Sequence, residues 1–308
     1  MSVGAWGETR EPLIGVEEDD LKRGWLEVSG YQLDATLGSG QTFRWKRVTG
    51  GGGWEGVIHG RWVRLSQGHG GVEVWTVRGS AEAQTFDWIR RYLRVDEDLD
   101  AILAGFPNDP ILEEAVARWR GLRLLRQDPW ECLASFILSS TKRIPQIEQV
   151  VGLLCERHGE VVRAPSSSGL CYGFPAVERV AALSEEQLRT CKMGFRAPNL
   201  LACARRIESG ELDLGRVGRM ELEEARMELM KVPGVGPKIA DCALLFGFGF
   251  ERAFPVDVWV ARVLRRYYFR GRAVPLPRLR AFVHRHFGEH AGYAQQYLFH
   301  HIRHLDLL

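Results

Sequence analysis

The chain has 308 residues, of which 45% are hydrophobic and 26% are charged, and its formal net charge at pH 7 is +2. This length suggests about two domains, and this composition is typical of a globular protein, which excludes a disordered or collagen-like chain. The sequence lacks the apolar run of about 18 residues needed to cross a membrane, and it lacks an N-terminal secretory signal. Its six cysteines are scattered without a CxxC pair, which argues against a disulfide framework or an iron–sulfur cluster. We therefore expect a soluble intracellular protein with reduced thiols.

The small net charge conceals two segments of opposite sign. Residues 1–20 carry six acidic residues and one arginine, and their lack of periodicity predicts an acidic flexible tail. Residues 252–308 carry ten arginines, three acidic residues and six of the nine histidines. A basic segment is typical of a protein that binds a polyanion such as nucleic acid, although a solvated helical surface has the same composition.

Short segments rich in aromatic and β-branched residues, separated by glycine-containing turns, predict an antiparallel sheet in the first part of the chain. The predicted strands are Trp25–Val28, Tyr31–Thr36, Thr42–Val48, Trp54–His59, Arg61–Leu65 and Val72–Val77.

Beyond about residue 80 the pattern becomes helical. Asp128 and Pro129 are predicted as the N-cap and first residue of a helix, and Ser184 and Gln187 have the spacing of a capping box. Further helices are predicted at 147–158, 198–208, 220–231, 237–247, 258–269, 277–287 and 291–304. The sequence thus predicts an α+β fold. Its expected parts are the tail at 1–20, a small antiparallel sheet domain with flanking helices at 21–120, and a helical domain at 121–308.

The segment from Val232 to Cys242 predicts two helices joined by a tight turn. Gly234 and Gly236 allow close backbone approach, and free N–H groups at the start of the second helix can hold a phosphate without reading base sequence. A plain corner between two helices has the same pattern, so the turn alone leaves both interpretations open. Lys238 lies in the first turn of the second helix, where the helix dipole disfavours a cation by about 0.3–1 kcal/mol. Such a lysine either points into water or has a chemical role, for instance as a nucleophile.

Asp257 directly precedes another predicted helix, and N-capping is a sufficient explanation for a carboxylate there. The helix dipole and the backbone N–H groups keep such a carboxylate ionised, so it can also stabilise a developing positive charge. A lysine nucleophile and an ionised carboxylate beside a phosphate-binding turn suit attack on a sugar carbon of a nucleotide.

Five blocks of sequence carry a family resemblance, and they are Ser39–Trp45, Leu124–Pro129, Val232–Cys242, Pro255–Val258 and Ala291–Gln295. Together they resemble the 8-oxoguanine DNA glycosylase/AP lyase family of the helix-hairpin-helix superfamily with a Gly-Pro-Asp motif. The resemblance extends from about residue 24 to the end of the chain. It implies that residues 121–308 form a helix-hairpin-helix glycosylase domain.

The resemblance implies a bifunctional enzyme that removes 8-oxoguanine from double-stranded DNA and then nicks the strand by β-elimination. Lys238 would attack C1′ of the flipped-out nucleotide and form a Schiff base, and Asp257 would stabilise the charge on the sugar. Gly40 would read the lesion through its backbone carbonyl, because 8-oxoguanine has an N7–H donor where guanine has an acceptor. The other expected base-binding residues are Cys242 and Phe299 as a sandwich, Gln295 at the Watson–Crick edge, and Pro255.

By the same resemblance, Gly234, Val235 and Gly236 would hold a DNA phosphate, with a possible monovalent cation at the hairpin. Arg196 matches an arginine that contacts the cytosine opposite the lesion. Other positions depart from the family on the side of the opposite strand. The departures are Thr141 and Lys142 for two asparagines, Gln146 for a second cytosine-contacting arginine, Phe195 for a wedge tyrosine, and Trp259 for a DNA-contacting histidine. These changes lead us to expect a relaxed or differently built preference for cytosine opposite the lesion.

Two alternatives remain open at this stage: a related glycosylase for another damaged base, and a noncatalytic DNA-binding module. Gly40 and Gln295 disfavour the first, and the presence of both Lys238 and Asp257 disfavours the second. The histidines predict no catalytic metal, because no cysteine or carboxylate cluster completes a ligand set. We expect a monomer that does not bind membranes, placed in the cytoplasm and nucleoid of a bacterium or the nucleus of a eukaryote.

Overall fold

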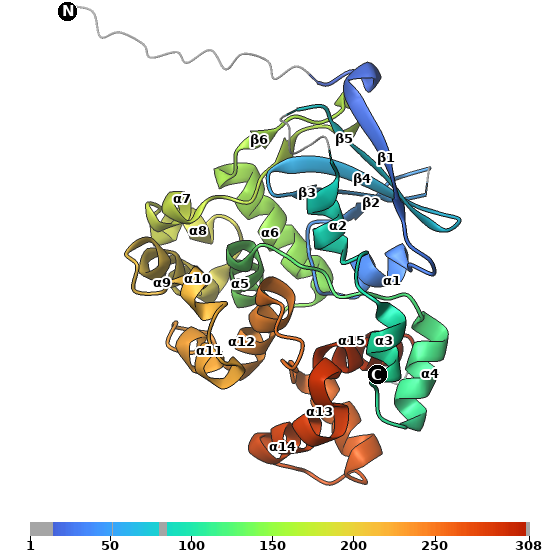
Figure 1. Ribbon diagram of the computed structural model, residues 1–308. Helices are drawn as coiled ribbons and strands as arrows, with labels where there is room; N and C mark the ends of the chain where they lie inside the picture. Colours follow the sequence, from blue (N-terminus) through green and yellow to red (C-terminus); the bar gives the residue numbers. More distant parts are fainter. Residues whose placement is uncertain (1–14, 51, 80–84, 306–308) are drawn as a thin grey trace, which may run out of the picture.

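The computed structural model describes residues 15–50, 52–79 and 85–305, and it places a small sheet beside a larger group of helices (Figure 1). The sheet is antiparallel, with the strand order β1-β5-β4-β3-β2. Its strands are β1 (Leu21–Glu27), β2 (Lys46–Arg47), β3 (Trp54–Ile58), β4 (Arg61–Gly68) and β5 (Gly71–Val77). A short separate pair joins β6 (Val161–Val162) to β7 (Cys171–Tyr172). The predicted α+β class is confirmed.

One face of the sheet is buried against helices. Ile58, Leu65 and Val74 are each at most 3% exposed. They share a hydrophobic cluster with Leu33, from a helix between β1 and β2, and with Ile89, from the helix that follows β5. Alternation of inward and outward side chains along the strands produces this face, since successive residues of a strand point to opposite sides. The sheet therefore has a hydrophobic core of its own.

Two of the predicted strands are wrong. Tyr31–Thr36 overlaps helix α1 (Leu33–Gly38), and of Thr42–Val48 only β2 is extended and paired. Leu33 packs in the core of the sheet while Ala35 packs in the core of the helices. A segment that is buried on two sides lacks the one-sided stripe of an amphipathic helix, so its apolar pattern imitates a strand.

The last residues of the expected acidic tail contact the rest of the protein. Most of it, residues 1–14, lies outside the described residues. Val16 is 5% exposed, its N–H bonds to the Ala164 carbonyl at 3.1 Å, and it bridges to Pro165. Residues Glu18–Asp20 form a 3-10 helix that leads directly into β1. Burial of one apolar side chain and pairing of its backbone thus attach Val16 to the loop between β6 and β7.

The helices occupy the remainder of the chain and form a second hydrophobic core. In chain order they are α2 (Asp87–Leu93), α3 (Leu99–Ala104), α4 (Pro110–Trp119), α5 (Pro129–Leu138), α6 (Ile144–His158), α7 (Val177–Ala181), α8 (Glu185–Arg189), α9 (Ala197–Glu208), α10 (Leu214–Val217), α11 (Leu222–Leu229), α12 (Pro237–Ala243), α13 (Val258–Tyr268), α14 (Leu276–Phe287) and α15 (Ala291–Arg303). Short 3-10 turns lie at 166–168, 194–196 and 288–290, and Leu244–Phe248 forms a π-helix after α12.

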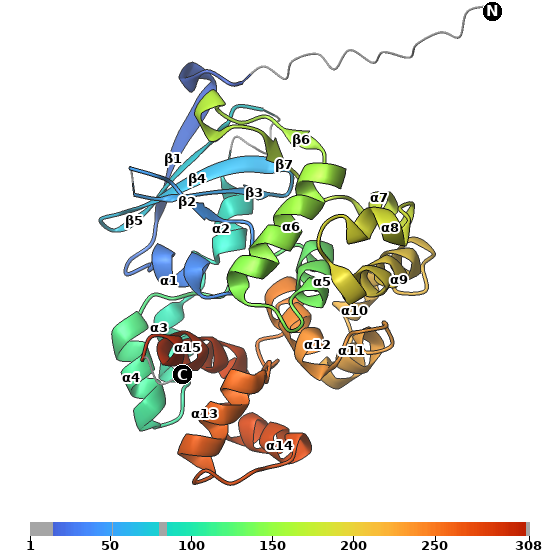
Figure 2. The ribbon, with the colours of Figure 1, turned by 180° about the vertical axis from the view of Figure 1, so that it is seen from behind.

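The predicted helix starts are confirmed where a side chain caps them. Asp128 accepts from the Glu131 N–H, and Ser184 accepts from the Gln187 N–H. Helix α6 lies between α5 and the β6–β7 pair and contacts both α5 and β7 (Figure 2). Helices α3 and α4 follow the sheet in sequence but contribute to the helical core, where α4 packs against α15. Helix α15, near the C-terminal end, thus packs against a helix that follows the sheet in the chain.

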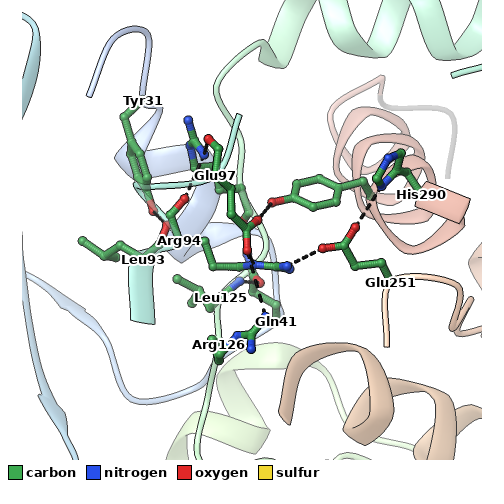
Figure 3. Close-up of polar contacts among 11 residues, drawn as sticks. Tyr31, Gln41, Leu93, Arg94, Glu97, Leu125, Arg126, Glu251 and His290 are labelled. Carbon is green, nitrogen blue, oxygen red and sulfur yellow. Dashed lines mark hydrogen bonds and ion pairs between the residues drawn. The ribbon is translucent and has the colours of Figure 1, made fainter. Parts of the chain in front are cut away.

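A buried ion-pair network ties three distant segments together (Figure 3). Arg94 is 4% exposed and pairs with Glu97 on its own segment and with Glu251 on the loop before α13. Glu97 also accepts from Tyr293 Oη at 3.1 Å, and Glu251 contacts His290 Nδ1 at 2.8 Å. This network joins the end of α2 to the start of α15 and to the segment that leads to Asp257.

Arg94→Met is expected to lower the free energy of unfolding by about 2–3 kcal/mol, because it removes the buried partner of two carboxylates that remain partly buried. Urea denaturation at neutral pH measures the effect, and Arg91→Met at an exposed position of the same helix is the control. A loss below about 0.5 kcal/mol, the usual range of a surface substitution, would contradict the role given to this network.

Candidate active site

The turn between α11 and α12 has the hairpin geometry that its glycines predict. Gly234 has a positive φ of 78°, and a Cβ there would lie 2.1 Å from Asn199 Nδ2, so only glycine fits. The Val235 N–H bonds to the Val232 carbonyl at 3.0 Å and closes the turn. Gly236 is the N-cap of α12, and the space where its side chain would be is open. The backbone at the start of α12 is therefore accessible to an anion.

Lys238 lies in the first turn of α12 and reaches toward the end of α5. Its Nζ donates to Ser139 Oγ at 3.3 Å and lies 5.1 Å from the centre of the Phe136 ring. The side chain is half-buried. Cys242 lies one turn further along α12 and is 3% exposed, and burial raises the pKa of its thiol to about 12. The thiol is therefore neutral at physiological pH, which makes it a poor nucleophile.

Asp257 is the N-cap of α13, as predicted, and its carboxylate accepts from the Val260 N–H at 2.7 Å. Burial raises the pKa of Asp257 above its usual value, against the opposing effects of the backbone hydrogen bonds and of the charge on Lys238. The charge of Lys238 thus acts on the Asp257 carboxylate, although the two residues are 19 positions apart in the chain. The segment before Asp257 is fixed by the buried ring of Pro255.

Gly40 lies on the loop after α1 and faces α15. Its φ is +82°, and a Cβ there would lie 3.6 Å from Phe299 Cε1 and 3.5 Å from Arg303 Nη1. The next residue, Gln41, holds the loop in place: its Oε1 accepts from the Leu125 N–H at 2.7 Å (Figure 3), and its Nε2 donates to the Arg123 carbonyl at 2.9 Å. Two of the sequence blocks, around Gly40 and around Leu125, are therefore joined by one buried amide.

Helix α15 supplies the other side chains expected to contact the base. Gln295 is 5% exposed, and its Oε1 has no hydrogen-bond partner among the described residues. Phe299 is half-buried one turn later. A buried amide oxygen without a protein partner is costly unless water or a ligand supplies a donor.

The residues expected at the opposite strand are grouped around the loop between α5 and α6. Arg196 is buried, and its Nη2 donates to the Ser140 carbonyl and to Thr141 Oγ1. Thr141 has a φ of +58°, a conformation that β-branched residues rarely adopt and that asparagine tolerates well. The arginine thus holds this strained loop together within the protein.

The remaining members of that group lie at the surface. Phe195 is 60% exposed and Trp259 is 39% exposed, and both rings are available to bases or sugars. Lys142 is half-buried beside Thr141. The Gln146 side chain accepts from the Arg143 N–H at 3.0 Å, so its oxygen caps α6 instead of pointing freely outward.

Sequence reasoning missed two side chains in this region. Ser139 accepts the hydrogen bond from Lys238, and Arg303 lies against Gly40 and Phe299. The spacing of four residues between Phe299 and Arg303 would have placed both on one face of a helix. Ser139 comes from a helix end far away in sequence, and no local pattern connects it to Lys238.

The described residues contain no group of three or more His, Cys, Asp and Glu side chains arranged to hold a metal ion. His300 packs edge-to-face against Trp119 and at a tilt against His304, with ring centres 4.4 Å apart in both pairs. Within the described part of the chain, none of the helices is long and apolar enough to cross a membrane.

Comparison with known proteins supports the same assignment. Residues 26–133 match the family described as 8-oxoguanine DNA glycosylase, N-terminal domain, and residues 134–278 match the HhH-GPD superfamily of base excision DNA repair proteins. The N-glycosylase/DNA lyase OGG1 of Arabidopsis thaliana is 33% identical over 294 residues, which cover 87% of this chain and 76% of the relative. A probable N-glycosylase/DNA lyase of Methanothermobacter thermautotrophicus is 35% identical over 66% of this chain and 70% of its own length.

A solved structure shows the same architecture. The Clostridium acetobutylicum 8-oxoguanine glycosylase/lyase, in complex with double-stranded DNA containing cytosine opposite 8-oxoguanine, superimposes with a TM-score of 0.84 at 31% identity. The match covers 94% of this chain and 100% of that structure. The hairpin, the lysine, the capping aspartate and these similarities lead to one conclusion: the chain belongs to the 8-oxoguanine DNA glycosylase/lyase family of the HhH-GPD base excision repair superfamily.

Proposed function

We propose that this protein excises 8-oxoguanine from double-stranded DNA and then nicks the strand at the resulting site. The observation that carries the proposal is the position of Lys238, which is half-buried at the hairpin, with Nζ 3.3 Å from Ser139 Oγ at the end of α5 and with its charge acting on Asp257. Simple DNA binding requires neither the half-buried lysine nor the carboxylate whose burial is costly. The protein acts inside the cell, in whichever compartment holds the DNA.

The proposed chemistry begins with a bond from Lys238 Nζ to C1′ of the flipped-out nucleotide. The bond between C1′ and the base breaks, and the base leaves with the electron pair and takes up a proton. Asp257 stabilises the positive charge that develops on the sugar. Opening of the sugar ring gives a Schiff base, loss of a C2′ proton expels the 3′ phosphate, and water then releases the lysine.

The lesion is selected at the Gly40 loop and at α15. The Gly40 carbonyl accepts from N7–H of 8-oxoguanine and repels the N7 lone pair of guanine. Gln295 pairs with the Watson–Crick edge, and its unpaired buried oxygen supports this role. Cys242 and Phe299 flank the base, and Pro255 fixes the segment beside it.

The hairpin residues Gly234, Val235 and Gly236 hold a phosphate of the DNA backbone at the start of α12, where the N–H of Val235 is already used to close the turn. A monovalent cation between the hairpin and this phosphate is compatible with the open space at Gly236. Phe195 enters the duplex as a wedge, and Lys142 and Trp259 contact the DNA beside it.

Four duplexes test the activity and its selectivity together, each with one 8-oxoguanine opposite C, T, G or A. Release of the base and nicking of the strand are measured separately, with and without heating in alkali. We expect both reactions, with excision rates opposite the four bases within about tenfold, since Gln146 caps a helix and Arg196 is engaged by the loop. An excision rate opposite cytosine far above the other three would refute the relaxed selectivity, and failure to release 8-oxoguanine from any duplex would refute the proposed function.

A further inference from the structure

Arg303 lies next to two residues that are expected to bind the lesion, Gly40 and Phe299. It lies one turn after Phe299 on α15, and its guanidinium carbon is 5.5 Å from the centre of the Phe299 ring. Its Nη1 is 3.5 Å from the position of a Gly40 Cβ, where Phe299 Cε1 is 3.6 Å away. Arg303 therefore adjoins both the backbone that reads the lesion and the ring that stacks on it.

The Arg303 guanidinium is poorly satisfied within the protein. Its Nη1, the same atom that faces Gly40, is buried and has no hydrogen-bond partner among the described residues. Burial lowers the pKa of Arg303, and the charges of Asp257 and Glu148 oppose this change. Neither of these two carboxylates lies within 4.0 Å of the guanidinium. A buried guanidinium nitrogen without an acceptor is costly unless a ligand accepts from it.

We propose that Arg303 donates a hydrogen bond to a carbonyl oxygen of the flipped 8-oxoguanine, beside the N7–H that Gly40 reads. This inference rests on the proposed function. The N7–H of the lesion lies between the O6 and O8 carbonyl oxygens. The Gly40 carbonyl can accept from N7–H while the Arg303 guanidinium beside it donates to a carbonyl oxygen. Together these two groups complement the donor and the acceptors on that edge of the base.

The same contact aids departure of the base. When the bond to C1′ breaks, the base receives an electron pair, and negative charge grows on its ring nitrogens and carbonyl oxygens. A fixed cation near those oxygens is favourable in the transition state. Arg303 would thus act on base release and not on β-elimination, which takes place after the base has lost its bond to the sugar.

Arg303→Met tests whether Arg303 acts on base release and not on β-elimination. Methionine preserves much of the length and apolar packing of the side chain and removes the hydrogen-bond donor. Two single-turnover rates are measured on the full-length chain: excision of 8-oxoguanine, and nicking of a preformed abasic site. We expect excision to fall about 10- to 100-fold, as for loss of a hydrogen bond from a charged group. Nicking of the abasic site is expected to stay within about twofold of the original rate. Arg303→Lys, which restores a cation, is expected to recover part of the excision rate.

Arg120→Met is the matched control, because this exposed arginine pairs with Asp100 away from the pocket and its loss changes the net charge equally. Equal losses of excision and nicking in Arg303→Met would overturn the inference, since they would mean that Arg303 acts through Asp257, a phosphate or the fold. Unchanged excision would also overturn it. If the unmodified protein nicks abasic DNA but releases no 8-oxoguanine, the proposed function fails first, and the inference fails with it.

Discussion

Lys238→Gln is expected to abolish both base release and strand nicking, with a loss of at least about 10³-fold in the single-turnover rate. Glutamine retains much of the length of the side chain but cannot form a bond to C1′. The hairpin glycines and the cap of α12 are unchanged by this substitution, so binding to a duplex with an uncleavable abasic analogue is expected to persist.

The matched control is Lys46→Gln, on an exposed position of β2. It removes one positive charge from the protein without touching the hairpin, and its excision rate is expected to equal that of the unmodified protein. A Lys238→Gln protein that still nicks the strand would assign the nucleophile to another amine, such as a chain terminus or a different lysine.

Asp257→Asn is expected to reduce excision by about 10²- to 10³-fold while leaving the protein at least as stable at neutral pH. The reason for the first effect is the loss of the negative charge next to the developing cation on the sugar. Asparagine is as good an N-cap as aspartate, so α13 retains its start.

The stability effect follows from the sign of the pKa change. Burial raises the pKa of Asp257, so the ionised carboxylate costs folding free energy above that pKa, and this cost disappears as the pH falls through it. The neutral amide removes the cost at pH 7. Thermal unfolding at pH 7 therefore should give a melting temperature equal to or above that of the unmodified protein. A large drop in that temperature, or an undiminished excision rate, would contradict the role given to Asp257.

The positions of Lys238 and Asp257 at helix starts could be predicted because the neighbouring sequence marks each of them. Lys238 is a cation at the disfavoured end of a helix, and Asp257 follows a proline and precedes an amphipathic run. The fold class and the long helices were likewise predicted from periodicity. The segment Tyr31–Thr36 was not, because burial on two sides removed the helical stripe.

Contacts between distant segments lay beyond sequence reasoning. Arg303 looks like one of many basic residues in the C-terminal segment, and only the approach of the Gly40 loop distinguishes it. The same holds for Gln41, whose buried amide joins two blocks that are more than 80 residues apart. Such links depend on tertiary packing, which a linear pattern does not encode.

Borohydride trapping tests the central claim most directly. The protein and its Lys238→Gln variant are each incubated with a duplex that contains one 8-oxoguanine, in the presence of borohydride, which reduces a Schiff base to a stable amine. The account predicts a covalent protein–DNA adduct with the unmodified protein and none with the variant, together with base release by the unmodified protein alone. An unmodified protein that binds the duplex without forming an adduct, or a variant that forms one equally well, would contradict the assignment of Lys238 as the nucleophile.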